Sequence, residues 1–247
     1  MIYDVVIIGG GPSGATAAEE LVKKGRKVAF LDKSGRIKPC GGAVPPRLIK
    51  DFKIPDDQLV AKIKTARMIS PTSRKVDMPI ENGYVGMVDR ENFDEYLRKR
   101  ATLLGASRYT GNFVKVDRTS DLPSVIYREK STGDQKKLIT KSIIGADGAR
   151  SSVARAEIPG GKEIPYVIAY HEIIKAPNND TYDPDRCDVI YDGKISPDFY
   201  GWVFPHGKHA SVGMGTGVDG VDLKKATKML RESANLIDCQ TIRREGA

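Results

Sequence analysis

The sequence predicts an α/β fold, in which a Rossmann-like βαβ domain with a parallel sheet is joined to a second α+β domain with an antiparallel sheet. An apolar strand over Tyr3–Gly9 runs into glycines, a helix over Ala15–Lys24 and a second strand over Lys27–Asp32. One such βαβ unit takes roughly 30 residues, and the unbroken apolar run is typical of a strand buried in a parallel sheet. After residue 157 the pattern changes to short strands separated by turns, which is typical of an antiparallel sheet.

The other elements follow from hydrophobic periodicity and turn residues. We expect further helices at Arg47–Phe52, Arg90–Leu104 and Leu223–Leu236. The expected strands are Ala66–Ser70, Tyr84–Val88, segments near 112–118, 123–129 and 137–140, Ser142–Ala146, Val167–Ile174, Asp188–Tyr191, Gly201–Phe204 and Ala210–Gly215, with a turn at Gly133-Asp134. Residues 1–75 and 90–156 are assigned to the first domain, and residues 76–89 and 157–247 to the second. After the last helix we expect no further element.

The bulk composition is that of a soluble globular protein. Of the 247 residues 40% are hydrophobic and 29% are charged, and no apolar run reaches the roughly 18 residues of a membrane-spanning helix. The first residues lack the basic and apolar regions of a signal peptide, so we expect a cytoplasmic protein. Three cysteines without metal-ligand spacing predict free thiols and no metal site.

The net charge of +8 is spread along the chain. The longest basic run is Arg98-Lys99-Arg100. A nucleic-acid binder usually concentrates its charge on one element, so the net charge is interpreted as that of a basic, soluble surface. We therefore expect no nucleic-acid partner. The charge also suits anionic partners: a dinucleotide phosphate, a diphosphate or an acidic membrane surface.

The hexapeptide Gly9-Gly10-Gly11-Pro12-Ser13-Gly14 fits the dinucleotide-binding pattern G-x-G-x-x-G, and it lies between a strand and a helix as that pattern requires. Gly9 permits the tight turn, Gly11 lets the backbone approach a pyrophosphate, and Gly14 lets the helix pack closely. Pro12 and Ser13 complete the loop, whose free N–H groups and helix dipole favour phosphate. Asp32 ends the second strand, where a carboxylate binds a ribose diol, and Lys33 follows it.

Two further segments relate this unit to flavoproteins. The segment Gly145-Ala146-Asp147-Gly148-Ala149-Arg150-Ser151 follows an expected strand, and Arg90 precedes Phe93-Asp94-Glu95-Tyr96-Leu97. The chain thereby resembles the flavin-dependent hydroxylase and reductase superfamily, which carries G-A-D-G-x-x-S and R-x-x-F-D-x-x-L elements. The resemblance implies bound FAD, with Gly145 and Asp147 near its ribityl and pyrophosphate groups and Arg90 near its ribityl–phosphate region. Taken alone, Asp147-Gly148 is a turn and Arg90 a surface residue.

An aromatic motif follows in the second domain. In Tyr200-Gly201-Trp202-Val203-Phe204-Pro205, strand geometry puts the three aromatic side chains on one face, which is either a core face or an apolar pocket. With Gly213-Met214-Gly215, the motif resembles Y-x-W-x-F-P-x(7,8)-G-x-G of the geranylgeranyl reductases. The segments 38–43, 87–90 and 164–172 extend the resemblance to the reductases of bacteriochlorophyll and chlorophyll biosynthesis.

This resemblance implies FAD as bound cofactor and NADPH as reductant. The substrate would be a geranylgeranyl group, on the pigment or as the free diphosphate, reduced to phytyl, with a possible peripheral contact at the photosynthetic membrane. Tyr200, Trp202, Phe204, Pro205, Gly213 and Gly215 would form the substrate pocket. An isolated alkene is a poor hydride acceptor, so a proton donor is needed, and Cys40 and Tyr200 are the candidates. His171 and His206 are interpreted as ordinary polar residues.

Members of the family are longer and carry a second FAD element, a Gly-Asp pair, in their C-terminal part. Gly133-Asp134 is only a hairpin turn here, so we expect an N-terminal fragment that is cut inside the substrate domain, holds FAD poorly and lacks activity. Two alternatives stay open. An FAD-dependent aromatic monooxygenase would share every feature through Asp147, and a truncated, non-catalytic flavin-binding module would share the whole sequence.

Overall fold

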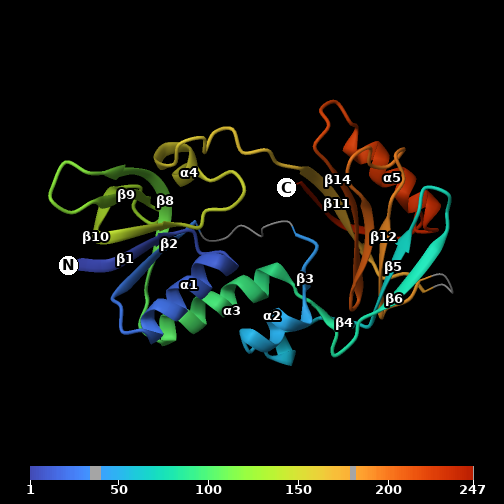
Figure 1. Cartoon of the computed structure of the whole chain (residues 1–247), viewed down its shortest axis with the longest axis horizontal. Coiled ribbons are helices and arrows are strands. Elements are labelled where there is room, and N and C mark those ends of the chain that lie inside the picture. The colour runs from blue at the N-terminus through green and yellow to red at the C-terminus, as the bar shows by residue number, and fades with distance from the viewer. Residues whose placement is uncertain (34–39, 179–181, 247) are drawn as a thin grey trace. The chain divides into compact units, whose positions relative to one another are not determined.

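The computed structural model describes residues 1–33, 40–178 and 182–246. The chain forms two compact units, Met1–Ile37 with Glu91–Ile164, and Lys38–Arg90 with Pro165–Ala247 (Figure 1). This division differs from the boundaries expected from the sequence, because residues 38–75 fall in the second unit and residues 157–164 in the first. The physical reason is the strand Thr65–Ile69, which pairs with strand Arg186–Ile190 of the second unit.

The first unit contains a closed ring of five strands in the order β1-β10-β9-β8-β2. They are β1 (Ile2–Ile8), β2 (Val28–Asp32), β8 (Ser107–Asp117), β9 (Ser124–Glu129) and β10 (Gln135–Gly145). Strand β1 lies between β10 and β2, parallel to both, as the βαβ pattern predicted. Strands β8, β9 and β10 are joined as antiparallel neighbours. The ring encloses an apolar core that includes Val6, Leu31 and Val125.

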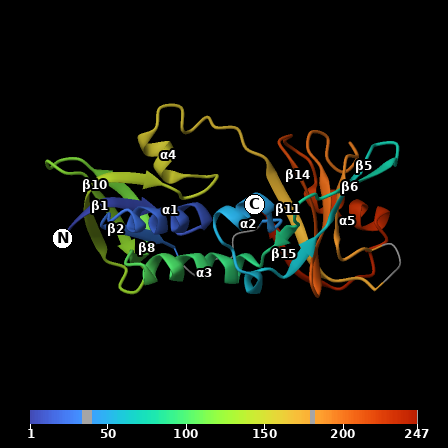
Figure 2. The same ribbon diagram turned by 60° about the horizontal axis from the view of Figure 1, so that its bottom comes forward.

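Helices α1 (Pro12–Lys23) and α3 (Arg90–Leu103) pack on the outer side of the parallel strands, and α4 (Ser152–Glu157) follows β10 (Figure 2). The contact buries Ala18 of α1 and Ala101 of α3 against Ile7 and Phe30. Helix α1 begins at Pro12 rather than Ala15, because the fixed φ of proline suits the first helical position.

The expected strands near 137–140 and at 142–146 are wrong as separate elements, since β10 is continuous over Gln135–Gly145. Lys141, which lies between the two expected strands, has an exposed side chain whose Nζ lies 2.8 Å from Oδ1 of Asp4, so it does not interrupt the strand. The turn at Gly133-Asp134 is present between β9 and β10, and Gly133 adopts φ +77.

The second unit is built on a seven-stranded sheet in the order β15-β11-β14-β13-β12-β5-β6. These strands are β5 (Thr65–Ile69), β6 (Lys75–Pro79), β11 (Ile168–Lys175), β12 (Arg186–Ile190), β13 (Gly201–His206), β14 (His209–Thr216) and β15 (Thr241–Gly246). Every pair is antiparallel except β12 with β5. Helix α5 (Leu223–Ser233) covers one face (Figure 1) and buries Leu230 against Val203, Val212 and Met214.

Part of the opposite face is covered by a small sheet of β3 (Ala43–Val44), β7 (Val85–Met87) and β4 (Ala61–Ile63). Ile63 and Met87 pack there with Cys187 of β12 and Phe204 of β13. Helix α2 (Pro46–Asp51) and the 3-10 helix η1 (Asp56–Gln58) complete this region.

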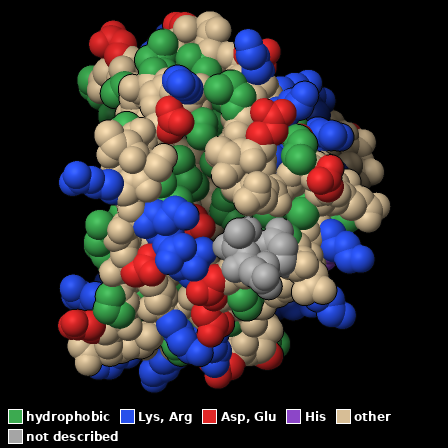
Figure 3. All heavy atoms as spheres, turned by 90° about the vertical axis from the view of Figure 1, so that its right-hand side faces the viewer, with side chains coloured by type: hydrophobic (Ala, Val, Ile, Leu, Met, Phe, Trp, Pro, Cys, Tyr) green, Lys and Arg blue, Asp and Glu red, His purple; other side chains and the backbone are tan. Residues whose placement is uncertain are grey.

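The expectation that no element follows the last helix is wrong. Strand β15 pairs with β11 along Thr241–Gly246, and Arg243, Arg244 and Glu245 all lie in the pairing. Figure 3 shows acidic and basic side chains interspersed on one face of the molecule. Within the described ranges, no helix is long and apolar enough to span a membrane, and no cluster of metal ligands is found.

Candidate functional site

The two glycine motifs of the first unit meet at the carboxyl ends of β1 and β10. Ile8 and Gly145 are partners in the parallel register, and the Ala146 N–H donates to the Ile8 carbonyl at 2.7 Å. A Cβ on Gly9, whose φ is +116, would lie 2.1 Å from the Ala146 carbonyl oxygen. The contact therefore requires glycine at this position and fixes the G-x-G-x-x-G loop beside the G-A-D-G turn.

The amino end of α1 has no side-chain cap. Its N-cap, Gly11, has no side chain to cap the helix, and no acidic residue lies in the first turn. A Cβ on Gly14 would lie 1.8 Å from the Gly9 carbonyl oxygen, so only glycine allows the helix to start this close to the strand. Uncapped N–H groups and the helix dipole favour a phosphate here, which fits the pyrophosphate of a dinucleotide.

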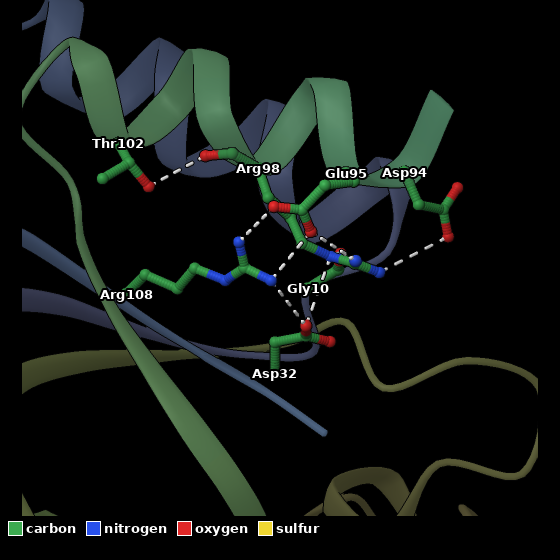
Figure 4. Close-up of polar contacts among 7 residues, drawn as sticks. All are labelled: Gly10, Asp32, Asp94, Glu95, Arg98, Thr102 and Arg108. Atoms are coloured by element: carbon green, nitrogen blue, oxygen red, sulfur yellow. Dashed lines mark hydrogen bonds and ion pairs between the residues drawn. The ribbon is translucent and has the colours of Figure 1, made fainter. Parts of the chain in front are cut away.

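Asp32, at the end of β2, faces two arginines (Figure 4). Its Oδ2 lies 3.3 Å from Arg98 Nε and 3.4 Å from Arg108 Nη2. Arg98 Nε also donates to the Gly10 carbonyl at 2.7 Å, which ties α3 to the glycine loop. The side chain of Asp32 is thus held at the position where a ribose diol is expected, and its charge is balanced.

Glu95 of α3 joins this cluster. It accepts hydrogen bonds from Arg108 Nη1 at 2.7 Å and from Arg98 Nη1 at 3.1 Å (Figure 4). The hydrogen bond from Arg108 lowers the pKa of Glu95, and that from Arg98 contributes. The same bond raises the pKa of Arg108. Two arginines of the longest basic run, Arg98-Lys99-Arg100, have structural contacts: Arg98 is buried, and Nε of Arg100 lies 2.5 Å from the buried Glu19 carboxylate.

The Asp147 carboxylate caps α4. Its Oδ2 accepts from the backbone N–H of Ser152 at 2.6 Å, and its Oδ1 accepts from the Ser151 hydroxyl. Gly145 has a packing role, because a Cβ there would lie 2.9 Å from Val153 of α4. The G-A-D-G-x-x-S element thus builds the β10–α4 turn against Gly9. Contact of Asp147 with FAD stays a prediction.

In the second unit a row of aromatic side chains runs along the sheet face opposite α5. Tyr200 stacks on Phe199 with ring centroids 4.1 Å apart, and it meets the edge of Trp202 at 6.2 Å. Phe204 continues the row, 6.2 Å from Trp202. Pro205 alternates to the other face of β13, as strand geometry dictates. Trp202 is 6% exposed, whereas Tyr200 and Phe204 are half-buried.

The two glycines of β14 make room for this row. A Cβ on Gly213 would lie 2.7 Å from Cζ2 of Trp202, and one on Gly215 would lie 2.9 Å from the Phe199 ring. Burial raises the pKa of Tyr200, and nearby Tyr191 adds to the effect, so its phenol stays protonated at neutral pH.

The Cys40 loop lies against the same strand. A Cβ on Gly41 would lie 3.3 Å from the Phe204 ring, and one on Gly42 would lie 2.7 Å from Nε2 of His206. The Cys40 thiol is exposed and accepts from the Gly42 N–H at 3.4 Å. The structure therefore places Gly41, the residue after Cys40, against the Phe204 ring, and a role of the Cys40 thiol as proton donor stays a prediction. The preceding residues 34–39 lie outside the described part of the chain.

Comparison with known proteins decides the family. Residues 3–190 match the family described as pyridine nucleotide-disulphide oxidoreductase, and residues 166–240 match the geranylgeranyl reductase catalytic domain. The chain is 60% identical to a geranylgeranyl diphosphate reductase of Rhodobacter capsulatus, over 100% of this chain and 63% of that protein. The chain belongs to the geranylgeranyl reductase family. The expected family resemblance is thereby confirmed.

Two further similar proteins are also named as geranylgeranyl reductases or as reductase-like. The chloroplastic geranylgeranyl diphosphate reductase of Arabidopsis thaliana is 38% identical over 93% of the chain and 52% of that protein. A solved geranylgeranyl bacteriochlorophyll reductase-like protein from Thermoplasma acidophilum superposes with a TM-score of 0.87 at 25% identity, covering 100% of this chain and 66% of that one. The chain thus spans 52% to 66% of the length of these three proteins.

The expected α/β fold is confirmed by the solved relative and the oxidoreductase family match. A flavin-dependent brominase, at a TM-score of 0.80 and 19% identity, shares the fold alone. The glycine cradle, the uncapped α1 and these matches support FAD as the dinucleotide of this family member. Lys33 is exposed and Arg90 is the half-buried first residue of α3, so their contacts with FAD stay predictions.

Sequence reasoning missed Arg98 and Arg108 as neighbours of Asp32, and Ser211 as the partner of Trp202. The only available signal for Arg98 was its place on the helical face of Phe93 and Leu97, which the structure buries. Nothing in the local sequence distinguishes Arg108 or Ser211.

Proposed function

We propose that this chain provides the FAD site and an aromatic part of the prenyl site of an FAD-dependent reductase. The reductase hydrogenates a geranylgeranyl group, carried by a (bacterio)chlorophyll pigment or by diphosphate, to phytyl with NADPH as reductant. The observation that carries the proposal is the joint presence of the glycine cradle at β1–α1 and the Tyr-x-Trp-x-Phe-Pro row on β13. The name of the 60% identical relative, geranylgeranyl diphosphate reductase, supports it.

In this proposal Trp202 and Phe204 bind the isoprenoid chain and exclude water from the reacting alkene. Reduced FAD supplies the hydride when it is bound. Since the alkene must also gain a proton, positive charge develops on its tertiary carbon, and aromatic faces stabilise a cation by roughly 0.5–2 kcal/mol each. Tyr200, with its protonated phenol, and Cys40, whose neighbour Gly41 lies against Phe204, remain the proposed proton donors.

The test is prenyl reduction by the purified holoenzyme. Geranylgeranyl diphosphate and a geranylgeranylated pigment are each supplied with NADPH, and the products are analysed by mass spectrometry for the gain of two hydrogens per reduced double bond. Consumption of O2 with a hydroxylated product would instead establish a monooxygenase. Absence of turnover in a preparation that retains FAD would favour a non-catalytic flavin-binding module.

Trp202→Ala separates a pocket role from a core role. As a pocket residue, its loss leaves FAD bound and the thermal midpoint nearly normal, while turnover falls about ten-fold for a lost contact of about 1.4 kcal/mol. As a core residue, its loss costs roughly 3–5 kcal/mol of stability, and FAD is released as the fold fails. The matched control is Val203→Ala, which removes packing from the α5 face of the same strand. Loss of stability and turnover together in Trp202→Ala would contradict the pocket role.

A further inference from the structure

Beside the aromatic row, four side chains from four adjacent strands form a buried polar chain. Trp202 of β13 donates its indole N–H to the Ser211 hydroxyl of β14 at 3.1 Å. The same hydroxyl lies 2.8 Å from Nδ1 of His171 on β11. Nε2 of His171 lies 2.8 Å from the Glu245 carboxylate of β15, and Arg243 Nε lies 2.5 Å from the other oxygen of that carboxylate.

The chemistry of these groups favours one direction for the series. An indole N–H can only donate and a carboxylate can only accept. Within the described residues Nε2 of His171 makes no hydrogen bond, but the Glu245 carboxylate 2.8 Å away repels a lone pair and so favours a proton on Nε2, which leaves Nδ1 as an acceptor. Ser211 accepts from Trp202 and has its own proton free to donate to Nδ1. These two hydrogen bonds point away from Trp202, and the contact between His171 and Glu245 is electrostatic.

Two of these polar side chains are almost fully buried, so each depends on a hydrogen-bond partner within the protein. Ser211 is 1% exposed and His171 is 2% exposed. Burial lowers the pKa of His171, although Glu245 opposes the shift, so the ring is neutral as the direction requires. A buried polar group without a partner is costly, so the hydroxyl and the imidazole hold each other in one arrangement. Gly213 completes it, since a Cβ there would lie 2.4 Å from Cβ of His171 and 2.7 Å from the indole.

We propose that Ser211, His171 and Glu245 are positioning residues that fix the indole of Trp202 and thereby set the shape of the prenyl site. This inference rests on the proposed function of Trp202 as a lining residue of that site. The series of polar side chains runs from Glu245 on β15 through β11 and β14 to Trp202 on β13. A residue on an edge strand of the sheet thereby acts on a side chain three strands away.

The test observes Trp202 directly. The holoenzyme is labelled with 5-fluorotryptophan, and the ¹⁹F resonance of Trp202 is identified as the one that disappears in Trp202→Phe. We expect Ser211→Ala to move this resonance and to lower prenyl turnover about five-fold, the factor that corresponds to one hydrogen bond of roughly 1 kcal/mol. FAD occupancy should be retained. Ser211→Thr, which restores a hydroxyl, should recover the wild-type ¹⁹F resonance and the wild-type prenyl turnover.

Two further variants keep the test independent of simple destabilisation. Glu245→Met removes the carboxylate that lies 2.8 Å from His171 Nε2 and should also move the Trp202 resonance. Val212→Ala lies on the same strand as Ser211 but faces α5, so it should lower the thermal midpoint without moving the resonance.

An unchanged resonance in Ser211→Ala, or an equal shift in Val212→Ala, would overturn the inference. A shifted resonance with wild-type kcat and KM would overturn the link to the prenyl site. If the wild-type enzyme reduced no prenyl chain, the proposed function would fail, while the resonance comparison would still decide whether the polar chain fixes Trp202.

Discussion

Replacing Arg98 by methionine should destabilise the first unit far more than removal of an exposed arginine. Methionine keeps much of the aliphatic volume but leaves two buried carboxylates without their shared cation. The Asp32 side chain is 7% exposed and that of Asp94 is 4% exposed, at 3.3 and 3.8 Å from the guanidinium. The variant also removes the hydrogen bond from Arg98 Nε to the Gly10 carbonyl.

Breaking a buried ion pair costs about 3–5 kcal/mol, because the remaining charge is uncompensated. Arg108 stays 3.4 Å from Asp32, so we expect the low end, about 3 kcal/mol. In a protein of this size 1 kcal/mol moves the thermal midpoint by roughly 2–4 °C, so the midpoint should fall by roughly 6–12 °C. FAD content should fall with it, because the glycine loop loses its tether.

The matched control is Arg118→Met. Arg118 lies 2.7 Å from Glu157, but its side chain is 62% exposed, and an exposed pair contributes only about 0–1 kcal/mol. Both variants are unfolded thermally under circular dichroism, and FAD is quantified after denaturation. Equal midpoints for the two variants would refute the claim that the Arg98 cluster holds the glycine loop.

Two other predictions concern the first unit. Gly14→Ala should release FAD from the purified protein, since its Cβ would lie 1.8 Å from the Gly9 carbonyl oxygen, whereas Gly193→Ala has open space and should retain FAD; chromatography of the denatured protein measures both, and equal retention would contradict the steric argument. At alkaline pH, the hydrogen bond with Tyr3 raises the pKa of Tyr109 to about 12. An unfolded phenol ionises near pH 10, so this stabilisation is present below about pH 10 and is lost as the pH rises toward 12. Tyr109→Phe should remove that loss, which denaturant midpoints across this range would reveal.

The sequence alone predicted those features that depend on residues lying close together in the chain. The glycine hexapeptide, its flanking strand and helix, and Asp32 follow one another within a single βαβ unit, so spacing alone predicted their arrangement. The alternation in residues 200–205 likewise predicted which aromatic side chains share a face. These elements depend on backbone geometry that neighbouring residues determine.

Other features depend on packing between distant segments. Arg108 reaches Asp32 across 76 residues of sequence, and Arg98 reaches Gly10 across 88. A charged residue carries no local signal for such a partner, so the contacts of Arg98 and Arg108 were not predicted. Strand β15 was missed for a similar reason: its Arg-Arg-Glu sequence has little apolar character, and its pairing with β11 stabilises it as a strand.

The seven-stranded sheet explains why the aromatic signature includes small and aliphatic residues as well as rings. Along β13, Trp202 and Phe204 face the side of His171 and the Cys40 loop, while Val203 packs in the core beneath α5. Gly213 on β14 admits the indole between the strands. Because neighbouring positions of one strand point to opposite faces, substitutions at 202 and 204 should act on turnover, and substitutions at 203 should act on stability. The signature is therefore two interleaved patterns on one strand, of which one builds the sheet and the other the proposed prenyl site.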